Sequence, residues 1–132
     1  MRDLLHIAAY AVSVLLLVVM ALLSVRGIVD PAGAAASFGV PVDDPSAYLY
    51  QLVYRSRNLV IAVAGLAFLF FGMWRALAIL ATVAIALPAF DIYALTQAGR
   101  EVTVVHPATL VALAIMTILL WLRLALNRPE KN

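Results

Sequence analysis

Apolar residues fill four long stretches of this chain, and polar residues gather between the stretches and at their ends. The stretches cover residues 4–25, 57–74, 76–96 and 107–126. About 20 apolar residues are needed to cross a bilayer as a helix. Strands of a membrane barrel would alternate apolar and polar residues, which these stretches do not do. The pattern predicts an all-α fold, a four-transmembrane-helix bundle, up-down-up-down, with a long first loop. Residues 1–132 are expected to form a single integral membrane domain.

The first stretch has a second interpretation, as a secretory signal peptide. "MRD" precedes an apolar run, and the small residues "AGAAAS" follow it. The hydrophobic region of a signal peptide extends for about 7–15 residues. This run is longer, and the small residues come only after Asp30 and Pro31. A retained first span is the favoured interpretation.

Glycine and proline predict where the helices begin, bend and end. The first loop contains "GIVDPAGAAASFGVPVDDP" and cannot be one helix, although "PAGAAASFGV" can form a short turn on the membrane surface. Asp44 as N-cap and Pro45 at the first helical position predict a second helix that runs from there to Trp74. Pro88 predicts a kink in the third span. The remaining signals are a tight turn at "GMWRAL", a helix end at Gly99 and a helix start at Pro107.

Composition supports a membrane protein. The chain is 66% hydrophobic and 12% charged, against about 45–50% and about 25% in soluble domains. The lipid bilayer is therefore the expected partner. The net charge of +2 does not indicate nucleic acid, because the basic residues are scattered at segment ends. There is no cysteine, and His6 and His106 fall on opposite sides of the membrane. No metal and no cofactor are predicted.

Basic residues give a weak signal for orientation. The side that holds both termini carries five of them, and the other side carries Arg26, Arg55, Arg57 and Arg100. If Arg55 and Arg57 belong to an internal site, the count becomes five against two. The positive-inside rule then predicts a multi-pass protein of the cell membrane with both termini in the cytoplasm. Trp74 and Trp121 fit an aromatic belt on the same side.

Asp91 lies within the third apolar stretch, where a carboxylate is costly and is expected to face the interior beside a cation. Helix spacing places Tyr54 and Arg57 on one face of the second span, with Arg55 on another. Arg57 is the first-choice partner of Asp91, and Arg26 is the second. The opposite side of the membrane holds no comparable set of interior-facing polar groups. The predicted intramembrane polar cluster comprises Arg57, Asp91, His106, Tyr54, Asn58 and Arg26.

Simpler interpretations stand beside this cluster. Asp91 could reach the headgroup region, or its pair could be a structural staple without chemistry. A solvated residue at a helix start is the default interpretation of His106. Asn58, Gly65 and Gly72 recur every seven residues, which favours close packing within the chain over a dimer face. A homodimer is left open.

Three segments resemble a known family. "YQLVYRSRNLVIAVAGLAFL", "WRALAILATVAIALPAFDIYAL" and "GREVTVVHPATL" are similar to domain-of-unknown-function family 4267, small four-span membrane proteins of bacteria and fungi. The resemblance covers roughly residues 38–121. Arg57, Asp91 and His106 match the family pattern, whereas Asn58 replaces a charged residue. The resemblance implies no established activity.

These observations leave three function classes and no decision on whether the protein is an enzyme. The first is a site for a lipophilic small molecule, with Asp91 as acid or base, His106 as proton carrier and Tyr54 as hydrogen-bond donor. The second is a structural or accessory membrane subunit. The third is a small-molecule or proton-coupled transporter, which the first span disfavours because it contains no acid within its apolar stretch.

Overall fold

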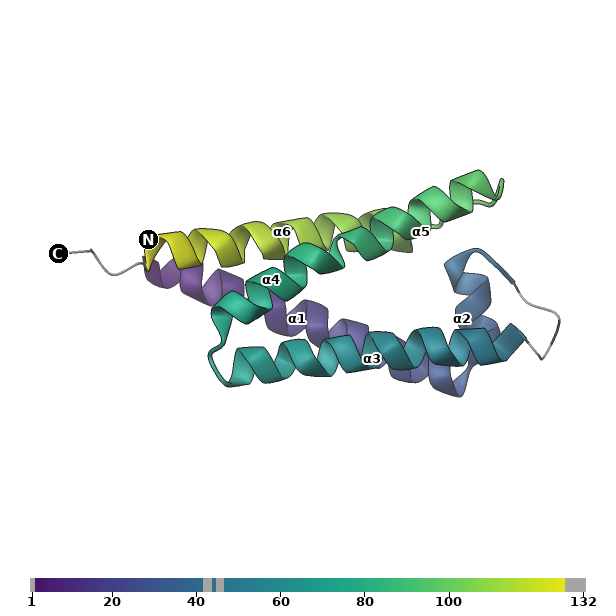
Figure 1. Cartoon of the computed structure of the whole chain (residues 1–132), viewed down its shortest axis with the longest axis horizontal. Coiled ribbons are helices and arrows are strands. Elements are labelled where there is room, and N and C mark those ends of the chain that lie inside the picture. Colours follow the sequence, from purple (N-terminus) through teal and green to yellow (C-terminus); the bar gives the residue numbers. More distant parts are fainter. Residues whose placement is uncertain (1, 42–43, 45–46, 128–132) are drawn as a thin grey trace.

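The structure is a computed structural model that describes residues 2–41, 44 and 47–127. Every regular element among them is a helix, and four spans are long and apolar enough to cross a membrane, the third formed by α4 and α5 together. The start of α1, the end of α6 and the α3–α4 turn lie at one end, which we call the terminal end, and α2 lies at the other (Figure 1). The predicted four-span helical fold is confirmed. The elements are α1 (Arg2–Val29), α2 (Pro31–Phe38), α3 (Tyr48–Phe70), α4 (Trp74–Ala84), α5 (Ala86–Gln97) and α6 (Val105–Leu126).

The first span packs against two others. It lies along α3 and also contacts α6, whereas α5 packs on α6. Gly65 on α3 is buried, and a Cβ there would lie 2.6 Å from Cδ2 of Leu17 on α1. The predicted packing role within the chain is thus confirmed for Gly65. Gly72 does not share it, because it is exposed in the α3–α4 turn with φ +66°.

The third span breaks where Pro88 predicts. The helix is interrupted at Ile85 between α4 and α5, and the span changes direction there. Proline has no backbone N–H to donate to the carbonyl four residues earlier, which here belongs to Ala84. The neighbouring bonds are long, at 3.4 Å from the Ala89 N–H to the Ile85 carbonyl. The predicted kink is confirmed.

The sequence correctly predicted some helix boundaries but not others. Gly99 follows α5 with φ +63°, and its N–H donates to the Thr96 carbonyl at 3.1 Å, as predicted for a helix end. Pro107 lies in the first turn of α6. The start of α3 was predicted too early, because α3 begins at Tyr48 with Ala47 rather than Asp44 at the N-cap position. Pro45 lies outside the described residues.

The first loop contains a helix of two turns, α2, in the segment where a short helical turn was expected. The Asp30 carboxylate accepts a hydrogen bond from the Gly33 N–H at 2.9 Å, Pro31 occupies the first turn, and Gly39 ends α2 with φ +100°. Ala34 and Ala35 are buried, and α2 packs against α1 and α3. In Figure 1, α2 closes part of the end opposite the termini, where the spans separate.

Candidate functional site

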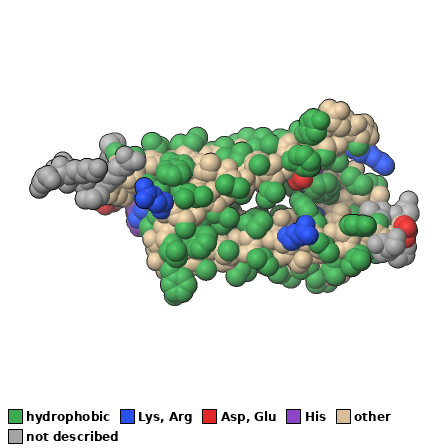
Figure 2. Space-filling view, viewed as in Figure 1, with side chains coloured by type: hydrophobic (Ala, Val, Ile, Leu, Met, Phe, Trp, Pro, Cys, Tyr) green, Lys and Arg blue, Asp and Glu red, His purple; other side chains and the backbone are tan. Residues whose placement is uncertain are grey.

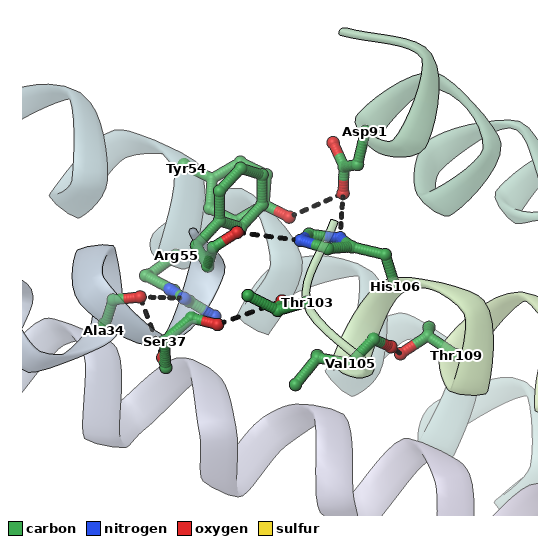
Figure 3. A network of polar contacts seen from close by, with 10 residues as sticks. Ala34, Ser37, Tyr54, Arg55, Asp91, Thr103, Val105, His106 and Thr109 are labelled. Carbon is green, nitrogen blue, oxygen red and sulfur yellow. Dashed lines mark hydrogen bonds and ion pairs between the residues drawn. The ribbon is translucent and has the colours of Figure 1, made fainter. Parts of the chain in front are cut away.

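The predicted convergence of polar side chains is seen for three residues from three different spans. The Tyr54 hydroxyl on α3 donates to Oδ2 of Asp91 on α5 at 3.4 Å. Nδ1 of His106 on α6 lies 3.6 Å from the same oxygen. Figure 3 shows the three side chains directed at one another. Asp91 is therefore held inside the bundle by polar contacts, rather than reaching freely for headgroups.

His106 is the most enclosed member of this group. It is 3% exposed, although it lies in the first turn of α6, so the solvated default interpretation is wrong. Its Nε2 lies 2.9 Å from the Phe38 carbonyl at the end of α2. The Phe38 ring meets the imidazole edge-on, with centroids 4.6 Å apart, and also contacts the Tyr54 ring. Contacts at both ring nitrogens therefore fix the orientation of the imidazole.

The contacts of His106 constrain where protons lie. A carbonyl oxygen only accepts hydrogen bonds, so the Phe38 contact assigns a proton to Nε2. In a neutral ring, Nδ1 would then point a lone pair at the Asp91 carboxylate. One further proton between Nδ1 and the carboxyl group relieves that repulsion and makes the pair neutral in sum. A neutral pair also suits a low-dielectric interior.

Donors from other elements hold α2 over this group. Nη2 of Arg55 donates to the Ala34 carbonyl at 3.3 Å, and the Thr103 hydroxyl donates to the Ser37 carbonyl at 3.2 Å (Figure 3). With His106 on the Phe38 carbonyl, three backbone carbonyls in the second half of α2 have side-chain contacts from other elements. The helix is thereby tied to α3, to the α5–α6 loop and to α6.

The predicted pair of Arg57 with Asp91 is wrong. Arg57 is exposed on the outer face of α3, beside Ser56, Val60 and Ile61. Arg55 is the inward-facing arginine, with its guanidinium carbon 5.3 Å from the Tyr54 ring centroid. The error was in the helical phase, since Tyr54 was grouped on one face with Arg57 rather than with Arg55.

A signal in the sequence could have corrected that phase. Gly65 marks the buried stripe of α3, and steps of three and four residues back from it lead through Ala62 and Asn58 to Arg55 and then Gln51. Ala62 is fully buried, and the other three are half-buried. The site residues missed from the sequence are Phe38, Arg55 and Thr103.

The other two predicted cluster members have different positions. Asn58 is half-buried on α3, one turn beyond Tyr54. Arg26 is exposed in the last turn of α1, and among the described residues no side-chain contact joins it to the group around Asp91. Two buried polar atoms of α3, Oε1 of Gln51 and Nε of Arg55, have no hydrogen-bond partner within the part of the chain that the structure describes. Unpaired buried atoms of this kind are uncommon and leave hydrogen-bonding capacity available.

The site remains open to the surroundings on one side. The Asp91 side chain keeps 20% of its exposure, against 4% for His106. Figure 2 shows a hollow between the upper helices and α3, with an acidic side chain at its upper rim. Asp91 is the acidic residue of α5. Within the described residues, no group of three or more potential metal ligands is found.

A second polar group at the opposite end was not predicted. There, Nε of Arg123 donates to Nδ1 of His6 at 2.8 Å, and both side chains contact the Trp74 ring. This group does not contradict the expectation about interior-facing polar groups, because His6 and its bond to Arg123 are exposed.

Comparison with protein families gives one finding. The model of the family described as "Domain of unknown function (DUF4267)" matches residues 15–120. Neither curated proteins nor solved structures give a match.

Proposed function

The chain belongs to the DUF4267 family, and because that family description assigns no activity, we propose a function from the site itself. The protein binds a lipophilic small molecule with one polar head group, and exchanges a proton with that head group at Asp91 and His106. The proposal rests mainly on the contact between Asp91 and His106, where one further proton on either side chain makes the pair neutral.

The open side of the site supports access from the membrane. The Asp91 side chain keeps 20% of its exposure, and Phe90, its neighbour in the chain, is 67% exposed. Figure 2 shows a hollow between α3 and the helices above it, with hydrophobic side chains around it. A molecule with an apolar body can reach the hollow through the hydrocarbon and place only its head group at the acid. This arrangement resembles typical small-molecule sites, which are mostly apolar with a few placed polar groups.

Each polar residue would have a defined task. Asp91 and His106 would hold the proton and pass it to or accept it from the head group, since a shared proton close to a bound group can serve general acid–base chemistry. The Tyr54 hydroxyl would orient the carboxyl group. The unpaired Gln51 and Arg55 atoms on the neighbouring face of α3 offer one acceptor and one donor to the same molecule.

The test is to extract the protein with its surrounding lipid, and to identify co-purified small molecules by native mass spectrometry. Asp91→Asn and Tyr54→Phe change the site by one functional group each, and Arg100→Gln, at an exposed position of the α5–α6 loop, is the control. We expect a bound molecule in the wild type and the control, at much lower occupancy in Asp91→Asn. Equal occupancy in all variants would place any bound molecule elsewhere. No bound molecule, together with a destabilised Asp91→Asn, would instead favour a structural staple in an accessory subunit.

A further inference from the structure

The end of the bundle that holds the termini contains an arginine with a fixed orientation. The Arg123 guanidinium carbon lies 3.6 Å from the centroid of the Trp74 ring. Its Nε donates to Nδ1 of His6 at 2.8 Å, and the His6 ring lies 5.2 Å from the same indole. Three helices, α1, α4 and α6, therefore hold one guanidinium. Within the part of the chain that the structure describes, no hydrogen bond is found for its two terminal amino groups.

The free edge of this arginine borders a recess. A shallow, open recess of about 650 Å³ lies between the start of α4 and the end of α6. Its charged and amide-bearing lining residues are Arg123, Arg75 and Asn127, and no carboxylate of residues 2–41, 44 and 47–127 lines it. Asp3, the carboxylate in the first turn of α1, is not among the lining residues. Two cations without a lining counter-ion create a site that attracts an anion.

The rest of the recess is apolar. Met73, Ile79 and Leu124 line it, and Met73 and Ile79 are about half exposed. A soluble anion would gain nothing from such walls, whereas a lipid could lay an acyl chain along them. Basic pockets between the ends of membrane helices are suited to anionic lipid head groups.

We propose that this recess binds the phosphate group of an anionic phospholipid from the surrounding leaflet. Arg123 presents two parallel N–H groups to the phosphate oxygens, a geometry that a guanidinium offers and an ammonium does not. Arg75 adds a second, more mobile cation, and the Asn127 amide adds a neutral donor. His6 is a positioning residue, because it acts on the lipid only through the orientation of Arg123. The proposal does not depend on the function proposed for the opposite end.

The test uses the full-length protein in a neutral detergent, titrated with short-chain phosphatidylglycerol or phosphatidylcholine and followed by native mass spectrometry. We expect phosphatidylglycerol to bind roughly tenfold more tightly, and Arg123→Gln or Arg75→Gln each to remove most of that preference. Arg57→Gln, which removes an equal charge at an exposed position of α3 away from the recess, should keep it. Equal binding of the two lipids by the wild type, or an equal loss in Arg57→Gln, would overturn the proposal.

Two further measurements distinguish this proposal from related explanations. Inorganic phosphate binding as tightly as phosphatidylglycerol would overturn the assignment to a lipid, because the apolar walls would then contribute nothing. His6→Ala retains both arginines, so it should weaken phosphatidylglycerol binding by a smaller factor than Arg123→Gln while leaving thermal unfolding without lipid close to the wild-type value. No effect of His6→Ala on lipid binding would remove the positioning role. Arg75→Gln tests the site even if Arg123→Gln fails to fold, because Arg75 is exposed.

Discussion

The two ends of the bundle hold polar side chains among apolar helices in different ways. At the α2 end, Asp91 and His106 face each other inside the bundle, and the Tyr54 hydroxyl and the Phe38 carbonyl supply the remaining contacts. At the terminal end, no carboxylate of the described residues pairs with Arg123, which is held by an imidazole and an indole face. The first arrangement places an acid and a base in contact. The second presents a permanent charge outward. A buried polar pair suits proton exchange, and a fixed cation suits recognition of an anion.

The largest effect is expected from a substitution that removes polar contacts at the α2 end of the bundle. In His106→Leu, Asp91 loses the only ion-pair partner that it has among the described residues, and the Phe38 carbonyl loses its donor. Removing one partner of a buried pair costs about 3–5 kcal/mol. We expect a large fall in thermal stability in detergent. Adding Asp91→Leu should recover part of the loss, because no carboxylate is then left alone. Strictly additive losses in the two single variants and the double variant would show that the residues do not interact.

A smaller effect tests how α2 is held. Gly39 has φ +100°, and a Cβ there would lie 2.8 Å from the Glu101 carbonyl oxygen. A non-glycine residue in such a conformation costs about 1–3 kcal/mol. In Gly39→Ala we expect faster amide hydrogen exchange across residues 31–38 and unchanged exchange across 74–84. Gly99→Ala is the matched control, because Gly99 also has positive φ but open space around it. Similar exchange in both variants would show that contact with Glu101 is unimportant.

At the terminal end, Trp74→Leu removes the ring that His6 and Arg123 contact. Cation–π contacts contribute about 0.5–1 kcal/mol when exposed and about 2 when desolvated. We expect destabilisation of about 1 kcal/mol, less than in His106→Leu, measured by thermal unfolding. Phe70→Leu is the control, since Phe70 is an aromatic residue of the same end that is 85% exposed. A larger loss for Trp74→Leu than for His106→Leu would reverse the comparison between the two ends.

The smallest effect concerns the outer face of α3. Arg57→Gln should change the free energy of unfolding by less than about 0.5 kcal/mol, as is usual for exposed positions. Arg55→Gln should cost more, about 1–2 kcal/mol, because it loses the bond to the Ala34 carbonyl. Thermal unfolding of the two variants under one condition checks the order. The reverse order would return Arg57 to the interior.

The sequence was sufficient for the spans but not for the exact site. Long apolar stretches, Pro88 and Gly99 act locally, so their consequences could be read directly from the chain. Tyr54, Asp91 and His106 were also identified, because topology alone brings their helix ends to one side. The partner of Asp91 was not, since neighbouring residues on a helix differ by about 100° in direction, and both Arg55 and Arg57 were available. The backbone carbonyls of α2 that accept hydrogen bonds could not be predicted, because no side-chain type marks them.

The hydrogen bond from Arg123 to His6 joins residues 117 positions apart, on the last and first spans. During synthesis the chain emerges from its N-terminus, so α1 is in the membrane long before its partner exists. The bond that completes the terminal end must therefore be among the last to form, after every span has been inserted. By contrast, α1 can settle against α3 as soon as the second span arrives. The protein is assembled from the first hairpin outward, and its last helix closes the bundle onto its first.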